Sequence, residues 1–493
     1  MNLLVNILVS HLPDPPAGIL WVGPACPKEY RLLGESGFDM TIANFTRENV
    51  NFPEGLLFDG IVFYQSAEYF LRLKRVLTKT RRFLNGSGRI IFCDALTEKS
   101  PVYTMKPSYL SRKLTMLLCE SGFRILDRFE CSSDKTDSEE CTSNLGVFVA
   151  RKDNFRIRSY MPGDEQKILP LFSQVFNTHR TMEHWQWKFR NNPFGSERIS
   201  LCLSDEGMPV SQYAGYPVPF ISSLENPDYP ACFRAFHSGD TFTHPSVRRI
   251  GLGKTGLLAR TTDYFCAAFL DGVVPFGFGF NTATIKKLGG RYLGYEFGEA
   301  VTCWDLNLSK SPLKKPGLFS KLFSGYDVTE VCSVDEEWDE FFDRVYGDYA
   351  FLAARDSAYI RWRYLECPDK IHRLFALRKK DRLMGWSVFS VQDDQLLWGD
   401  ALFDRQALKG VWCLLYHVAT WVFAGIKAIK AWFSTKPEWW RSHLLSLGFA
   451  PRPEPDGLTL CYRSFNNPLM DRHTVTERLN HSLYFTWGDS DLF

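Results

Sequence analysis

The stretch Gly239–Phe265, "GDTFTHPSVRRIGLGKTGLLARTTDYF", decides the fold of this chain. A β-strand running from His237 to His244 is predicted to end at Pro245, and a helix is predicted to begin after the glycines that follow. Glycines between a strand and a helix expose consecutive backbone N–H groups at the positive end of the helix, and such groups hold phosphate. The stretch therefore predicts a phosphate-binding turn.

Two nucleotide-binding motifs fit this turn incompletely. Gly251, Gly253 and Gly256 have the spacing of the dinucleotide fingerprint, but that motif needs an acidic residue after the next strand. Asp271 comes before that strand, "VVPFGFGF", and not after it. The segment Gly253–Thr255 ends like a P-loop, but arginine occupies the position of the loop's first glycine.

A third motif fits better. Arg248-x-x-Gly251-x-Gly253 matches the Arg/Gln-x-x-Gly-x-Gly/Ala signature of the GNAT acyltransferases. Upstream, "RIRSYMPGDEQKILPLF" places Asp164 at a helix start. Downstream, "VPFGFGFNTATIKKLGGRYLGYEFG" gives a strand, an Asn-initiated helix and an aromatic turn. The order resembles a GNAT domain over residues 154–305, and a plain glycine turn is the alternative.

The resemblance implies a mixed, splayed sheet with acetyl-CoA, or another acyl-CoA, beside the Asp240 strand. Loop amides would hold the coenzyme's pyrophosphate, as amides at helix starts do. The candidate coenzyme residues are Thr243, Arg248, Arg249, Ile250, Gly251, Leu252, Gly253, Lys254 and Asn281. For Asn281 a helix N-cap is the competing role.

Acyl transfer to an amine needs a base for the amine and an acid for the leaving thiolate. Asp240 and His237 are the candidate bases. The alternative role for Asp240 is that of a solvated turn or cap residue, and the alternative for His237 is that of a packed strand residue. The predicted last helix has no tyrosine, so Tyr292 and Tyr295, which follow it in sequence, are the candidate acids. Their alternative role is to pack as aromatic side chains against the sheet.

Two later segments repeat each other. "RTMEHWQWKFRNNP", residues 180–193, and "RDSAYIRWRYLECP", residues 355–368, share an arginine, a tryptophan and a proline at the same spacing, and a β pair follows each. We interpret them as two copies of one domain. The second copy lacks the glycine loop, so it resembles a GNAT fold without a coenzyme site.

In the GNAT fold that the sequence resembles, the first of these segments would line the side of the active site where the acceptor binds. Arg180 and Trp187 recur in the second copy and are expected to be structural. Glu183 and His184 do not recur, which makes them the candidate substrate residues.

The first 150 residues alternate strands and helices, as a doubly wound sheet does. "ILWVGPAC", "FDGIVFYQSAEYFLRLKRVL" and "GSGRIIFCD" resemble a class I SAM-dependent methyltransferase. Gly23-Pro24-Ala25-Cys26 replaces that family's glycine-rich loop, and proline has no N–H. Asn44 stands where the family has a ribose-binding acid. We expect a degenerate domain that binds S-adenosylmethionine weakly or not at all.

Composition excludes other classes. The 58 basic and 56 acidic residues give a net charge of only +2, which disfavours a nucleic-acid partner. The 13 cysteines form no Cys-x-x-Cys pair, so no metal site is predicted and reduced thiols in the cytoplasm are expected. The apolar stretch Val411–Ile426 is too short to span a bilayer, and we expect no membrane insertion.

The predicted fold class is α/β and α+β: a Rossmann-like sheet followed by two GNAT-like domains with mixed sheets. The predicted parts are a methyltransferase-like domain (1–152), a GNAT domain (153–305), a linker (306–325), a second GNAT-like domain (326–470) and a C-terminal tail (471–493). The predicted function is an acyl-CoA-dependent N-acyltransferase acting on a small-molecule amine, such as an amino sugar or biosynthetic intermediate. A non-catalytic assembly protein and a bifunctional methyl- and acyltransferase are the alternatives.

Overall fold

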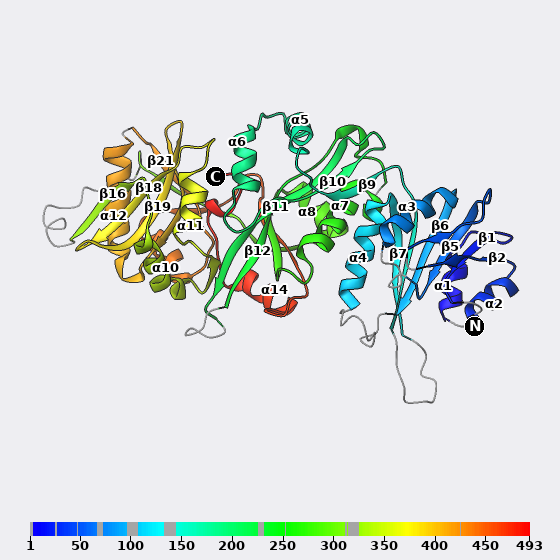
Figure 1. Ribbon diagram of the computed structural model, residues 1–493. Coiled ribbons are helices and arrows are strands. Elements are labelled where there is room, and N and C mark those ends of the chain that lie inside the picture. The colour runs from blue at the N-terminus through cyan, green and yellow to red at the C-terminus, as the bar shows by residue number, and fades with distance from the viewer. Residues whose placement is uncertain are drawn as a thin grey trace. The chain divides into compact units, whose positions relative to one another are not determined.

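The chain forms two compact units in the computed structural model (Figure 1). The first unit comprises residues 1–161, 200–212 and 242–269, and the second comprises residues 162–199, 213–241 and 270–493. The structure describes residues 3–24, 27–46, 48–66, 72–95, 107–132, 144–224, 231–251, 253–310, 313, 325–423 and 425–493.

The first unit is built on a six-stranded sheet in the order β2-β1-β5-β6-β8-β7. Strands β2, β1, β5 and β6 are parallel, and β8 lies antiparallel between β6 and β7. Its elements are α1 (Leu3–His11), β1 (Gly18–Val22), α2 (Lys28–Glu35), β2 (Asp39–Ile42), β3 (Asn44–Phe45), β4 (Val50–Asn51), β5 (Phe58–Tyr64), α3 (Leu73–Phe83), β6 (Leu84–Ala95), α4 (Pro107–Glu120), β7 (Phe123–Ser132) and β8 (Asn144–Lys152).

Alternate residues of these strands enter two separate cores. In β1, Leu20 and Val22 pack with α3 and α4 on one face, while Ile19 and Trp21 pack with α1 and α2 on the other. A parallel sheet covered on both faces needs such continuously apolar strands. The predicted mixed α/β class is confirmed for the described residues.

The first unit also holds strand β9 (Arg156–Ser159), which pairs antiparallel with β10 (Arg198–Leu203), and helix α7 (Leu257–Phe265). The glycine loop of the sequence precedes α7.

The second unit begins with α5 (Glu165–Phe176), whose N-cap is Asp164, as predicted. Its strands β11 (Pro209–Ser222), β12 (Ala231–Thr243), β13 (Phe276–Asn281), β23 (Thr459–Ser464) and β14 (Glu296–Ala300) are neighbours in one sheet. Strand β17 (Phe351–Ala353) pairs with β11 and with β24 (Leu483–Tyr484). Helix α8 (Ala283–Leu288) follows β13, and α14 (Arg472–His481) precedes β24.

A second sheet in this unit has the order β16-β18-β19-β20-β21-β15-β22. Its strands are β15 (Thr302–Asn307), β16 (Tyr326–Val331), β18 (Arg373–Lys379), β19 (Arg382–Gln392), β20 (Gln395–Phe403), β21 (Ala428–Trp432) and β22 (Ala450–Pro453). The accompanying helices are α10 (Glu336–Tyr349), α12 (Leu408–His417) and α13 (Glu438–Ser446).

The two sheets of the second unit exchange strands. Strand β15 follows β14 in sequence but lies between β21 and β22 of the other sheet. In return, β23 lies between β13 and β14. The exchange joins the two sheets of the second unit, and their buried residues form one core. The boundaries 153–305 and 326–470 stay a prediction, and most of the predicted linker lies outside the described residues.

The repeated segments form matching helices. Residues Met182–Trp185 (α6) and Ser357–Ile360 (α11) are short α-helices, and each continues into a π-helical turn, η2 (Gln186–Arg190) or η7 (Arg361–Leu365). Trp187 and Trp362 occupy the second position of these turns and are both buried. The equivalence expected for the two tryptophans is confirmed.

Candidate active site

Strands β12 and β13 run parallel but pair at only two positions, Phe236 with Gly277 and His237 with Phe278. Beyond these, β12 continues to Thr243 without further pairing to β13. On its other edge, β13 pairs with β23 from Phe276 to Asn281. The pairing of β12 with β13 therefore ends at His237 and Phe278.

His237 lies where the strands part. Its side chain is buried between the ring of Tyr216, stacked at 4.9 Å between centroids, and the ring of Phe278 at 5.0 Å. Neither ring nitrogen has a hydrogen-bond partner among the described residues. Burial lowers the pKa of His237 to about 4, against the opposing effect of Asp491, so the imidazole is neutral near pH 7.

Asp491 approaches His237 from the far end of the chain. Its Oδ1 lies 3.8 Å from His237 Nδ1 and accepts a hydrogen bond of 3.0 Å from the Tyr216 hydroxyl. Its Oδ2 accepts one of 2.8 Å from Lys188 Nζ. Burial acts to raise the pKa of Asp491, but Lys188, His237 and Arg363 together outweigh burial and hold this pKa well below its usual range.

Gly239 makes this arrangement possible. A Cβ at that position would lie 2.2 Å from Asp491 Oδ2 and 3.2 Å from Lys188 Nζ. Any side chain there would expel the carboxylate from its contact with β12. Sequence reasoning missed Asp491 because no local motif marks it and about 250 residues separate it from its partners.

Asp240 is neither a solvated turn nor a cap, which corrects the structural alternative considered for it. Its side chain is 7% exposed and forms ion pairs with Arg180 and, at 3.1 Å, with Lys188. Its φ of +52° interrupts the regular strand geometry of β12. Because both cations occupy its carboxylate, Asp240 is better placed to anchor η2 than to accept a proton.

The two candidate tyrosines differ. The hydroxyl of Tyr295 lies 2.7 Å from that of Tyr213, which in turn lies 3.0 Å from Ser238 Oγ on β12. A hydroxyl chain therefore joins Tyr295 to the parted strand. The Arg291 guanidinium lies over the Tyr292 ring, 5.4 Å from the ring centroid.

The glycine loop lies in the first unit. Gly251 and Gly253 have φ angles of +69° and +62°, and a Cβ on Gly251 would meet the carbonyl oxygen of Thr255 at 2.3 Å. The loop therefore requires glycine at 251. Arg248 Nε donates a hydrogen bond to the carbonyl oxygen of Thr243, which joins the loop to the last residue of β12.

The remaining residues predicted to bind the coenzyme differ in their exposure to solvent. Arg249, Ile250 and Lys254 are exposed, while Thr243 is buried and its hydroxyl lies 2.8 Å from that of Ser211. Leu252 lies outside the described residues. The expected N-cap role of Asn281 is wrong, because Thr282 occupies the N-cap of α8 and Asn281 is still paired in β13.

Of the two acceptor candidates, Glu183 is exposed in the first turn of α6. His184 Nδ1 lies 2.5 Å from Asp369, and its ring packs edge-on against Trp187. Burial lowers the pKa of His184 to about 4.

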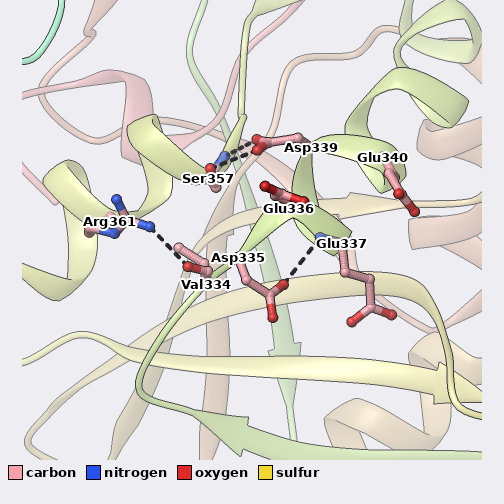
Figure 2. Close-up of a pocket in the computed structure, with 8 residues that line it drawn as sticks. All are labelled: Val334, Asp335, Glu336, Glu337, Asp339, Glu340, Ser357 and Arg361. Carbon is pink, nitrogen blue, oxygen red and sulfur yellow. Dashed lines mark hydrogen bonds between the residues drawn. The ribbon is translucent and has the colours of Figure 1, made fainter.

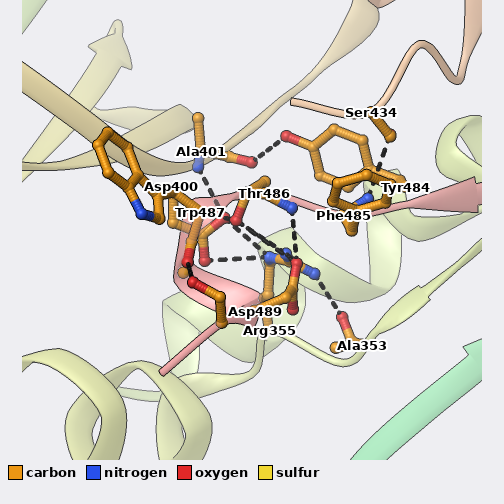
Figure 3. A network of polar contacts seen from close by, with 12 residues as sticks. Ala353, Arg355, Asp400, Ala401, Ser434, Tyr484, Phe485, Thr486, Trp487 and Asp489 are labelled. Atoms are coloured by element: carbon orange, nitrogen blue, oxygen red, sulfur yellow. Dashed lines mark hydrogen bonds and ion pairs between the residues drawn. The ribbon is translucent and has the colours of Figure 1, made fainter. Parts of the chain in front are cut away.

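The second copy carries a counterpart of this cluster. Gly399-Asp400 on β20 repeats Gly239-Asp240 on β12, and Arg355 repeats Arg180. The Arg355 guanidinium contacts Asp400 at 3.0 Å and Asp489 at 2.6 Å with no exposed surface (Figure 3). Aligning the repeat further along the sequence would have found this pair.

The second copy has no counterpart of the glycine loop. After β20, Asp404 caps a short turn and Gly410 falls inside α12, where a Cβ would meet Leu377 at 2.6 Å.

An acidic hollow lies at the start of α10, lined by residues that include Asp335, Glu337 and Asp339 (Figure 2). These carboxylates serve local structure: Asp335 caps the helix, Asp339 accepts from the backbone and hydroxyl of Ser357, and Glu337 pairs with Arg378. Within the described ranges, no group of three or more Cys, His, Asp or Glu is placed to hold a metal ion. No helix among these residues is long and apolar enough to cross a bilayer.

No protein-family model matches the sequence, and no curated protein is significantly similar to it. Solved structures resemble parts of the chain. A probable N-acyltransferase from Enterococcus faecalis is 12% identical, with a TM-score of 0.47 over 63% of this chain and 72% of that one. A GCN5-related N-acetyltransferase from Anabaena variabilis is 13% identical, with a TM-score of 0.46 over 63% and 73%.

A third is Saccharomyces cerevisiae N-myristoyltransferase with bound myristoyl-CoA, at 12% identity and a TM-score of 0.41 over 69% of this chain and 89% of that one.

Proposed function

We propose that this protein is an acyl-CoA-dependent N-acyltransferase that acts on the amine of a small molecule. The observation that carries the proposal is the parting of β12 from β13 immediately after His237 and Phe278. A thioester carbonyl placed there would meet backbone N–H groups of β12, which can stabilise a tetrahedral oxyanion. The strand then leads along the chain into the glycine loop.

The coenzyme's pyrophosphate is assigned to the loop Arg248–Lys254. Gly251 and Gly253, which both have positive φ angles and precede α7, support this, because phosphate is favoured at a helix N-terminus. The acyl group transferred is acetyl or a longer chain.

His237 is assigned the base. The amine nitrogen attacks the thioester carbon, the C–S bond breaks, and the amine's proton passes to the neutral imidazole. Asp491, 3.8 Å away, stabilises the imidazolium that forms. The leaving thiolate takes a proton from a hydroxyl, for which Tyr295, joined to β12 through Tyr213, is the candidate.

A thiol-release assay with acetyl-CoA and a panel of primary amines tests the proposal. Wild type should release coenzyme A only when an accepted amine is present, and His237→Gln should lower kcat about 100- to 10,000-fold, the usual contribution of a general base. His443→Gln is the matched control, because that histidine also has a pKa lowered by burial to about 4 but lies on α13. Equal rates for both variants would remove His237 from the mechanism, and no turnover with any amine would favour a non-catalytic assembly protein.

We also propose that residues 1–152 are a methyltransferase-like domain that no longer binds its cofactor. A Cβ at Gly23 would lie 2.5 Å from the carbonyl oxygen of Tyr64, so packing against β5 is enough to explain that glycine. Asn44 pairs with Asn51 in a short hairpin. Ala25 and Cys26 lie outside the described residues.

A further inference from the structure

The segment Thr486–Phe493, called here the 486–493 segment, contacts matched residues of the two repeated segments. Lys188 and Arg363 each occupy the third position of a π-helical turn, η2 or η7, directly after the equivalent tryptophans. Both side chains are buried. Lys188 Nζ donates to Asp491 Oδ2 at 2.8 Å, and Arg363 donates to main-chain oxygens of the same segment. Two equivalent cations, one from each repeated segment, therefore bind the stretch that carries Asp491.

Arg363 binds the 486–493 segment on both sides of Asp491. Its Nε donates to the carbonyl oxygen of Gly488 at 3.1 Å. Its Nη2 donates to the carbonyl oxygen of Ser490 at 2.8 Å and to an oxygen of Phe493 at 3.0 Å. A guanidinium presents its donors in a rigid planar fork, so one side chain can hold several main-chain oxygens in a fixed geometry. The main chain is thereby fixed directly before Asp491 and two residues after it.

A second contact anchors the 486–493 segment. The carboxylate of Asp489 is buried and accepts hydrogen bonds from Arg355 Nη2, at 2.6 Å, and from the backbone N–H of Thr486, at 2.7 Å (Figure 3). Close packing excludes a side chain at Gly488, where a Cβ would lie 2.0 Å from the Tyr364 hydroxyl oxygen. Arg355 and Tyr364 belong to the second repeated segment, which therefore fixes the chain directly before it reaches the candidate active site.

We propose that Arg363 positions Asp491 beside His237, so that a residue of the second repeated segment serves the reaction proposed at His237. The inference rests on the proposed function, in which Asp491 stabilises the imidazolium that His237 becomes. That stabilisation falls as the charges separate, so it depends on keeping the 3.8 Å between Asp491 Oδ1 and His237 Nδ1. Arg363 fixes the main chain on both sides of this carboxylate and is therefore a positioning residue.

The first measurement needs no turnover. In nuclear magnetic resonance spectra of the full-length protein at neutral pH, the ring signal of His237 is identified by its loss in His237→Gln. It should move in Asp491→Asn, which removes the neighbouring charge, and in Arg363→Lys, which keeps a cation but offers one nitrogen in place of two. Arg361→Lys is the matched control, because Arg361 lies on the same turn and donates to the carbonyl oxygen of Val334. A signal that Arg363→Lys leaves in place overturns the proposal, as does an equal movement in Arg361→Lys.

The second measurement is a double-variant cycle in the thiol-release assay. Asp491→Asn should lower kcat about 10- to 100-fold, the range of a charge-assisted hydrogen bond. Arg363→Lys should lower kcat in the wild-type background but leave it unchanged in the Asp491→Asn background, because no carboxylate is left to position. Arg361→Lys should leave kcat unchanged in both backgrounds. The KM for acetyl-CoA should be the same in all variants, because the glycine loop is intact.

Asp489→Asn is a second variant, which loosens the 486–493 segment at its contact with Arg355 and should act like Arg363→Lys in both measurements. Losses of kcat that are equal in the two backgrounds would give Arg363 a purely structural role and overturn the proposal. No turnover with any amine, while the His237 signal still moves in Arg363→Lys, would reject the proposed function and support the positioning of Asp491.

Discussion

Trp187 and Trp362 stack on each other with 5.4 Å between ring centroids, and each indole Nε1 donates to the other's carbonyl oxygen, at 2.7 and 3.0 Å. The two residues lie at the same position of the repeated segment. The two repeated segments therefore hold each other through these tryptophans.

Truncating either tryptophan to alanine should cost about 3–5 kcal/mol of unfolding free energy, because a large buried ring is lost and a carbonyl is left unpaired. Since the two rings share one contact, the double variant should lose clearly less than the sum of the single losses. Urea denaturation measures all three variants. Strictly additive losses would contradict the mutual packing.

Wild type should bind acetyl-CoA with micromolar-scale affinity, about −8 kcal/mol, in calorimetric titration. Gly251→Ala should raise the Kd at least about tenfold, because its Cβ would clash with the Thr255 carbonyl and distort the loop. Gly207→Ala is the matched control: its φ is +74°, close to that of Gly251, but a Cβ there meets nothing within 4 Å. Unchanged affinity in Gly251→Ala would move the coenzyme site elsewhere.

Stability should fall as pH drops from about 6.5 to about 4. The folded-state pKa of His237 is depressed to about 4, so between these values the unfolded chain binds more protons than the folded one. The stabilisation is complete above pH 6.5 and is lost as pH falls through the folded pKa. His237→Asn should flatten this slope relative to wild type in urea titrations across that range. His184 has the same depressed pKa, so its own Asn variant should act similarly.

Removing the buried Arg355 should be far more costly than removing an exposed arginine. Arg355→Met leaves Asp400 and Asp489 uncompensated in the core and should cost about 3–5 kcal/mol. Arg441→Met breaks an exposed pair with Glu438 and should cost at most about 1 kcal/mol. Chemical denaturation distinguishes them, and similar small losses would mean that the core relaxes around the two carboxylates.

S-adenosylmethionine should leave the Tm of the protein unchanged. Pro24 offers no N–H where a cofactor loop needs one, and packing alone explains Gly23. Tight binding would stabilise the folded state, so a shift of several degrees on adding the cofactor would show that the N-terminal domain retains its site.

Local patterns in the sequence were enough to predict the strand–turn–helix around Gly251, the alternating N-terminal elements and the repeated tryptophan segment. Each of these depends on residues close together in the sequence: a positive φ that only glycine adopts readily, an apolar period, or an arginine, a tryptophan and a proline repeated at fixed spacing. For the same reason His237 and Asp240 could be placed on one strand.

The tertiary structure alone decided what these residues contact. The exchange of β15 and β23 between sheets leaves no local mark, because a strand's own pattern does not identify its neighbours. Asp491 reaches His237 and Lys188 only because Gly239 leaves the space that its carboxylate fills. The sequence thus determined the elements of the site, and long-range packing decided which charges meet there.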